Sequence, residues 1–296
     1  MEIEQHPPHT ELPNSQVNPD FVTDQLPFPT DCGDNTLLRR IGFSAIALLI
    51  WFGSMVLIVI VPAIFLFPYL ASQDISLTNN PQLFEFSKTD PTSIFLQLIA
   101  IIPAHLLTVL LAWLVVTQFR KFSFRKTLGW NSGGFRWWHY LIVLSSFFVL
   151  AAVIGNYFPE KENDLIRMLK TSRSAVYIVA FVATFTAPFV EEVVYRGVLY
   201  SAFQRVMGVR AAFLIVTFLF ALVHVPQYYP SYSTIFLLGI LSVILTSIRV
   251  KTNNLLPCII LHTLFNGVQS CVLVLEPFFP KPEIPEQISA ILHIFK

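Results

Sequence analysis

Charged side chains are scarce in this sequence. Asp, Glu, Lys and Arg together make up 12% of the 296 residues, whereas 54% are hydrophobic. A soluble domain carries about 25% charged residues, so this composition excludes an ordinary water-exposed surface and indicates a lipid environment. The net charge is +1 and no dense basic cluster is present, which argues against binding to the phosphate backbone of a nucleic acid.

Several other sequence features are rare or missing. The three cysteines, Cys32, Cys258 and Cys271, cannot form a disulfide framework. The chain has no H-E-x-x-H motif, the short signature of many zinc proteases. It also has no evident inverted repeat, a feature of many transporters. The first apolar run begins near residue 41 and is too long for a signal peptide, so we expect it to be retained as a membrane span.

Long apolar runs are what the sequence has in abundance. Most of them approach the ~20 residues that a helix needs to cross ~30 Å of hydrocarbon. We therefore predict an all-α, polytopic transmembrane helical bundle with about seven spans. The apolar segments are roughly 41–69, 93–118, 139–158, 175–203, 211–225, 232–249 and 255–275.

The composition divides the chain into four predicted regions. Residues 1–38 are proline-rich and acidic and cannot bury a core, so we expect a disordered cytoplasmic tail. A three-span region follows at 39–158, and a membrane domain that carries the candidate site follows at 159–276. Residues 277–296 form a proline-rich C-terminal tail.

The basic residues predict an orientation in the membrane. With the N-terminus in the cytoplasm, the inside segments hold eleven Lys and Arg residues and the outside segments hold seven. Cytoplasmic loops carry an excess of Lys and Arg, which favours a cytoplasmic N-terminus and a C-terminus on the other side. The basic run 120–136 is then expected to be a solvated cytoplasmic loop. The prediction is a multi-pass protein of the cytoplasmic or plasma membrane.

Three charged residues interrupt the fourth apolar segment, in the stretch "FVEEVVYRGVLY". A charge at mid-bilayer costs about 2.5–3.5 kcal/mol on insertion scales, so it usually marks a working site. Glu192 and Arg196 are four residues apart on one helical face and can form an ion pair. Glu191 is rotated by about 100° from Glu192, which leaves its carboxylate for another task. Pro188, just before, removes a backbone donor and can bend the helix.

Two further polar pairs occur downstream at the same spacing. Phe220 and His224 are four residues apart, and so are His262 and Asn266. In the predicted topology all of these residues lie roughly 10–20 Å below the cytoplasmic surface, at 1.5 Å per helical residue. Residues from separate spans therefore share one layer and can converge. A lone histidine in the second span, His105, is expected to be an interhelical hydrogen-bonding residue.

This set of side chains suits the hydrolysis of an acyl bond. A carboxylate and a histidine on facing helices, Glu191 and His224, can hold and deprotonate a water molecule. His262 and Asn266 offer two donors from one helical face to a developing oxyanion. Water, base and oxyanion donors together favour peptide-bond hydrolysis without a serine or cysteine nucleophile.

The stretches "EEVVYRG", "FALVH" and "HTLFN" resemble the three motifs of the CAAX prenyl endopeptidase and bacteriocin-processing (CPBP, or Abi) family of intramembrane glutamic proteases. The resemblance covers roughly residues 175–275. It implies that Glu191 and His224 activate water and that His262 and Asn266 form the oxyanion hole. The same resemblance implies supporting roles for Glu192, Arg196 and Phe220, with no metal or other cofactor. The expected partners are the lipid bilayer and a peptide or lipidated-peptide substrate, with CAAX-type processing as one form of the activity.

Alternative interpretations remain open at this stage. The Glu192–Arg196 pair can be a packing contact between spans, and a lone intramembrane histidine is often structural. Two histidines and a glutamate are a conceivable zinc ligand set, which would make the protein a zinc-dependent membrane protease of the same family. Intramembrane charges also occur in proton relays, so a non-catalytic immunity or transport protein is the third alternative.

Overall fold

A computed structural model describes residues 37–73 and 80–278 of the chain. Within these residues every regular element is a helix and no strand occurs, as predicted. Residues 1–36 and 279–296, which make up nearly all of the two predicted tails, lie outside the described residues.

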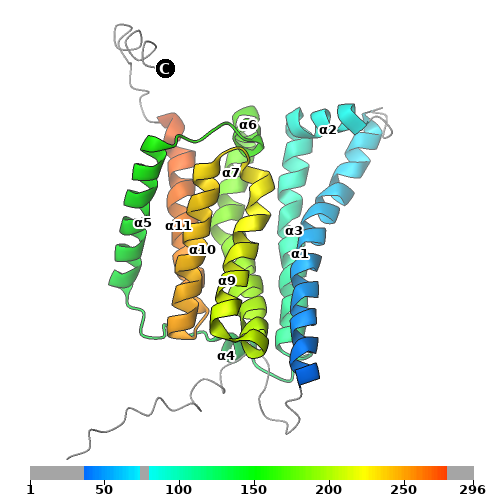
Figure 1. The fold of residues 1–296 in the computed structure, drawn as a ribbon. Helices are drawn as coiled ribbons and strands as arrows, with labels where there is room; N and C mark the ends of the chain where they lie inside the picture. The colour runs from blue at the N-terminus through cyan, green and yellow to red at the C-terminus, as the bar shows by residue number, and fades with distance from the viewer. Residues whose placement is uncertain (1–36, 74–79, 279–296) are drawn as a thin grey trace, which may run out of the picture.

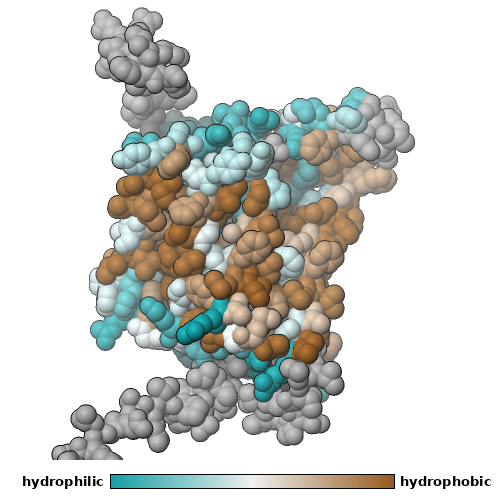
Figure 2. Space-filling model, viewed as in Figure 1, coloured by the Kyte–Doolittle hydropathy of each residue, from teal (hydrophilic) through white to brown (hydrophobic). Residues whose placement is uncertain are grey.

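Five long helices each cross the bundle once (Figure 1). Six segments in the described part of the chain are long and apolar enough to cross a membrane. Figure 2 shows a broad apolar band between two hydrophilic ends, so this is an integral membrane protein. The five single-crossing helices are α1 (Leu37–Ser72), α3 (Pro91–Val116), α5 (Trp137–Tyr157), α10 (Tyr232–Thr252) and α11 (Leu256–Leu275).

The sixth segment, Arg173–Tyr228, has 56 residues and crosses the bundle twice. Gly208 interrupts it with a non-helical backbone, at φ 81° and ψ 172°, a region that only glycine adopts readily. The Tyr195 and Phe220 rings lie 5.2 Å apart on the two sides of this break, so the chain reverses direction there. The described bundle therefore has seven crossings, in agreement with the seven predicted apolar segments. The segment consists of α7 (Arg173–Phe181), η2 (Val182–Thr186), α8 (Ala187–Glu192), η3 (Val193–Leu199) and α9 (Tyr200–Tyr228).

The start and the packing of α3 follow from its sequence. The Asp90 side chain accepts a hydrogen bond from the Ser93 N–H (2.8 Å), and a proline occupies the first helical position, as at many helix starts. Further along, Ala100 and Ala104 are buried against α1. Small side chains at this spacing let two membrane helices approach closely. The packing fixes how α3 is rotated and therefore which of its residues face the rest of the bundle.

Four short elements complete the described chain. These are α2 (Asn80–Thr89), α4 (Phe124–Leu128), α6 (Asp164–Thr171) and η4 (Glu276–Phe278). In Figure 1, α2 and α6 lie at the end of the bundle opposite α4. The helix α1 begins at the end of the bundle near α4, and α11 finishes at the opposite end. From the start of α1 to the end of α11 the chain therefore makes an odd number of crossings.

The basic run 120–136 is not simply a solvated loop, and this expectation was wrong in part. Leu128, at the end of α4, is fully buried within the main apolar cluster. The Leu255 N–H donates to the Gly129 carbonyl (2.8 Å), and Arg249 Nη1 donates to the Leu128 carbonyl (3.1 Å). The run is thus docked on the turn between α10 and α11. Arg249, one of the basic residues counted for orientation, is itself buried, and the orientation stays a prediction.

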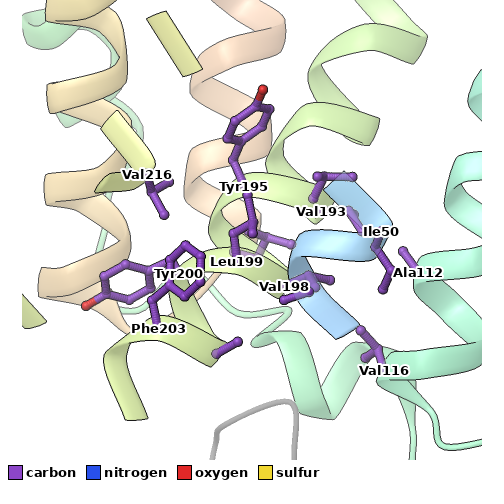
Figure 3. Close-up of a cluster of buried hydrophobic side chains, with 14 of the residues drawn as sticks. Ile50, Ala112, Val116, Val193, Tyr195, Val198, Leu199, Tyr200, Phe203 and Val216 are labelled. Carbon is purple, nitrogen blue, oxygen red and sulfur yellow. The ribbon is translucent and has the colours of Figure 1, made fainter. Parts of the chain in front are cut away.

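The main apolar cluster surrounds η3 (Figure 3). Val193 and Val198 of η3 are fully buried, and Figure 3 shows Ile50 from α1 and Ala112 from α3 on one side of this segment. On the other side, Val216 of α9 is also fully buried. Helices from both predicted membrane regions, 39–158 and 159–276, therefore contribute to one core, and the proposed division between them stays a prediction.

Candidate active site

The helix that carries Glu191 and Glu192 lies between two π-helical segments, η2 and η3. At the end of η2, the Ala187 N–H bonds the Val182 carbonyl, five residues back. The next residue, Pro188, has no N–H, so neither residue supplies a donor to the Ala183 carbonyl. Asn266 does: its Nδ2 donates to this carbonyl at 2.8 Å. π-Bulges occur frequently at functional sites, and here one orients a side chain of α11.

The predicted ion pair between Glu192 and Arg196 is present. Arg196 Nη1 lies 2.8 Å from Glu192 Oε1, and both side chains are 0% exposed. The remaining guanidinium nitrogens also find acceptors on α10. Nη2 donates to the Ser242 hydroxyl (2.8 Å) and to the Ser242 carbonyl (3.2 Å), and Nε donates to Thr246 Oγ1 (3.3 Å). The charge of Arg196 is thus compensated inside the bundle.

His262 connects the two glutamates. Its Nδ1 lies 2.9 Å from Glu192 Oε1, the oxygen that also binds Arg196. Because a carboxylate oxygen paired with a guanidinium only accepts, His262 Nδ1 is the donor in this bond. The other ring nitrogen, Nε2, lies 3.8 Å from Glu191 Oε2. A single imidazole is therefore placed between one neutralised carboxylate and one that is not paired with Arg196.

Glu191 is the more accessible of the two glutamates. Its side chain is 25% exposed, whereas that of Glu192 is fully buried. The Glu191 carboxylate also interacts electrostatically with His105 of α3 and with two phenols, Tyr195 and Tyr228. The expectation that helical rotation separates Glu191 from Arg196 agrees with these different surroundings.

His224 reaches the same cluster through aromatic contacts. Its Nδ1 lies 2.7 Å from the Phe220 carbonyl; a carbonyl only accepts, so this nitrogen donates and Nε2 of the neutral ring carries the lone pair. The ring stacks on Tyr228 with a centroid distance of 6.3 Å. Among the described residues no ion pair or hydrogen bond joins His224 to Glu191. Tyr228 stacks on the His224 ring and interacts electrostatically with Glu191.

Phe220 links the two halves of the cluster. It is fully buried, and the Arg196 guanidinium lies 4.6 Å from its ring centroid, within the range of a cation–π contact. The same ring lies 4.8 Å from the His224 ring and 5.9 Å from the His262 ring. The Phe220 ring thus contacts the rings of both histidines.

Asn266 is one turn beyond His262 on α11, as predicted, but it points one N–H at the Ala183 carbonyl. An asparagine amide has two N–H groups, so the second remains for another acceptor. The polar face of α11 continues to Ser270, whose hydroxyl donates to the Ala180 carbonyl (3.3 Å) and accepts from Thr184 Oγ1 (2.9 Å). α11 is thus held to the α7–α8 segment by a row of polar side chains.

Sequence reasoning missed several residues of this cluster. Tyr228 follows Phe220 and His224 at the same four-residue spacing, a signal that was available. Ser242 and Thr246 are likewise four residues apart and face Arg196. His105 was expected to form an interhelical hydrogen bond, and it does so with Thr186 Oγ1 (2.9 Å). Its proximity to Glu191 had no counterpart in the sequence pattern.

The described residues contain no group of three or more His, Cys, Asp or Glu side chains that could hold a metal ion. A cavity of about 610 Å³ lies elsewhere, between the end of α5 and the start of α10. It is lined mainly by apolar and aromatic side chains, including Tyr157 and Phe236, and contains none of the predicted site residues.

Comparison with known protein families gives a match to this part of the chain. Residues 173–268 match the family model described as type II CAAX prenyl endopeptidase, Rce1-like. The matched range runs from the start of α7 into α11 and contains both glutamates, Arg196, both histidines of the cluster and Asn266. No curated protein and no solved structure matches the chain.

Proposed function

We propose that this membrane protein hydrolyses a peptide bond with a water molecule activated by Glu191 and His224, because residues 173–268 match the Rce1-like type II CAAX prenyl endopeptidase family model. The substrate is a peptide within or at the membrane, and a prenylated C-terminal peptide is the form that the family description suggests.

The observation that carries this proposal is that two neighbouring carboxylates differ in burial and in binding partners. Glu192 is buried and binds Arg196 and His262, so its charge is neutralised within the bundle and its role is structural. Glu191 is one residue away, partly exposed and 3.8 Å from the same imidazole. A general base has to reach water and substrate, and of the two glutamates only Glu191 has that access.

In the proposed reaction Glu191 takes a proton from water while the oxygen attacks the peptide carbonyl carbon. His224 Nε2 accepts the second hydrogen bond of that water, since Nδ1 is occupied by the Phe220 carbonyl. The protonated Glu191 then delivers its proton to the amide nitrogen as the C–N bond breaks. Neither a nucleophilic side chain nor a metal ion takes part in these steps.

Two donors are available for the oxyanion that forms on the carbonyl oxygen. Asn266 contributes the N–H that is not used by Ala183. His262 contributes Nε2–H when its ring carries both protons, with the carboxylates of Glu191 and Glu192 as counter-charges beside the two nitrogens. Donors held in place before the reaction stabilise an oxyanion far better than mobile water does.

The test is cleavage by the purified full chain in lipid nanodiscs. The probe is an internally quenched peptide ending in S-farnesylcysteine and three apolar residues, and the membrane peptidomes of cells with and without the protein are compared in parallel. Glu191→Gln and His224→Ala should abolish cleavage without loss of folded protein. Glu160→Gln, on the loop that follows α5, is the matched control and should cleave like the wild type.

Full retention of cleavage by Glu191→Gln would contradict the proposed mechanism. Cleavage of neither the farnesylated probe nor any membrane peptide by the wild type would contradict the endopeptidase assignment. A biological effect that survives Glu191→Gln would instead favour a non-catalytic role.

A further inference from the structure

His105 lies on α3, outside residues 173–268 that match the family. The preceding residue, Ala104, is buried against α1. One helical step rotates a side chain by about 100°, which turns His105 from α1 toward the α7–η3 segment, whose elements α7, η2, α8 and η3 all contact α3. The half-buried imidazole therefore faces the segment that carries Glu191.

The hydrogen bonds around His105 determine which ring nitrogen carries the proton. Thr186 Oγ1 donates its one proton to the Val182 carbonyl (3.2 Å). In its second bond, to His105 Nδ1 at 2.9 Å, the hydroxyl must therefore accept. Nδ1 is the donor, and Nε2 of the neutral ring is left with a lone pair.

Thr186 is five residues before Glu191, at the end of η2. The bond from His105 thus ties the imidazole to the same helical run as the carboxylate. Glu191 and His105 interact electrostatically, and His262 Nε2 approaches the Glu191 carboxylate at 3.8 Å. Glu191 thus has the His262 imidazole of α11 beside it, and the His105 imidazole of α3 is bound to its own helical run through Thr186.

Resting on the function proposed above, we propose that His105 is a positioning residue for Glu191. Its Nε2 accepts a hydrogen bond from the carboxyl O–H that Glu191 acquires when it deprotonates water. This bond holds the acid in place until the proton passes to the leaving amide nitrogen. No proton remains on His105 at the end of the cycle, so the reaction balances as before.

The two ends of the ring can be tested separately by amide side chains. His105→Asn keeps a donor near the position of Nδ1, for Thr186, and removes the acceptor at Nε2. His105→Gln places an amide near the position of Nε2 and gives up the bond to Thr186. Thr108→Val, also on α3, removes a buried hydroxyl that bonds only the Ala104 carbonyl within the same helix and serves as the control.

The assay is steady-state cleavage of the quenched farnesylated peptide by each full-length variant in nanodiscs. His105→Asn should lower kcat roughly tenfold with KM unchanged, the effect of one lost hydrogen bond of about 1.4 kcal/mol. His105→Gln should recover part of that loss, and Thr108→Val should match the wild type. Thr186→Val should lower kcat less than His105→Asn, because it frees the ring without removing it.

The proposal is overturned if His105→Asn retains wild-type kcat, or if its whole effect falls on KM. It is also overturned if His105→Asn is active and His105→Gln is not, because the Thr186 bond alone would then matter. Glu191→Gln in the same assay separates the two proposals. Inactive Glu191→Gln beside fully active His105→Asn removes this inference alone, whereas active Glu191→Gln removes the proposed function.

Discussion

Replacing Arg196 with methionine would leave the Glu192 carboxylate charged and without its cation inside the bundle. Methionine has a similar length and keeps much of the contact with the Phe220 ring, so the main change is electrostatic. Both members of the pair are 0% exposed and their atoms lie 2.8 Å apart. After the change, Glu192 Oε1 keeps the bond from His262 Nδ1, and Oε2, buried without a hydrogen-bond partner among the described residues, remains so.

The expected loss follows from this burial. Removing one partner of a buried ion pair destabilises a protein by about 3–5 kcal/mol, chiefly because the other charge stays uncompensated. The double variant Glu192→Gln/Arg196→Met removes that charge and still offers an amide oxygen to His262. Its loss should therefore be only about 1–2 kcal/mol, from the donors that no longer reach Ser242 and Thr246.

The measurement is the free energy of unfolding by SDS titration in mixed micelles. The control is Lys170→Met, which breaks an ion pair of the same length, 2.8 Å to Glu162, whose side chains are 68% and 49% exposed. Exposed ion pairs contribute little to stability, so this variant should have the same free energy of unfolding as the wild type. Equal losses for Arg196→Met and the double variant, or no difference between Arg196→Met and Lys170→Met, would refute the reasoning.

Three other outcomes are expected. His262→Ala and Asn266→Ala should each lower kcat by about 10²–10³ in the peptide assay, the usual effect of one lost oxyanion donor; a change confined to KM would argue against that role. Treatment with 1,10-phenanthroline should leave the cleavage rate unchanged, and a loss that zinc restores would support the zinc-dependent alternative. Gly208→Ala should destabilise the bundle by about 1–3 kcal/mol because its backbone conformation suits only glycine. Gly239→Ala, with open space for the added Cβ and an ordinary helical backbone, should not, and equal effects of the two would contradict the requirement for glycine at position 208.

The features that sequence reasoning predicted are those that repeat within one helix. Apolar length predicted the seven crossings, and the four-residue spacing predicted the Glu192–Arg196 ion pair, because both depend on helix geometry alone. The same spacing placed His262 and Asn266 on one face of α11. These predictions required no knowledge of how the helices pack.

Contacts between helices were harder to predict. The Asn266 bond to Ala183 depends on a π segment followed by Pro188, and hydropathy carries no signal for a π-helical turn. The approach of His105 to Glu191 depends on the rotation of α3, which the contact of Ala104 with α1 determines. Leu128 was assigned to a solvated loop because basic residues surround it, although it is fully buried.

The two π segments on either side of Glu191 and Glu192 have a consequence for insertions and deletions. A π turn contains more residues than an α turn over a similar rise. The chain from Phe181 to Tyr200 therefore contains more residues than an α-helix of the same length would. Loss of a single residue from η2 could be absorbed by conversion to an α-helix. Because a five-residue π turn and a four-residue α turn each close about one turn of helix, the residues on its two sides would keep nearly the same relative orientation, and the carboxylates would still face α11. Loss of one residue from η2 should therefore be less damaging than substitution of the side chains of η3, because all seven residues of that segment, Val193–Leu199, are buried.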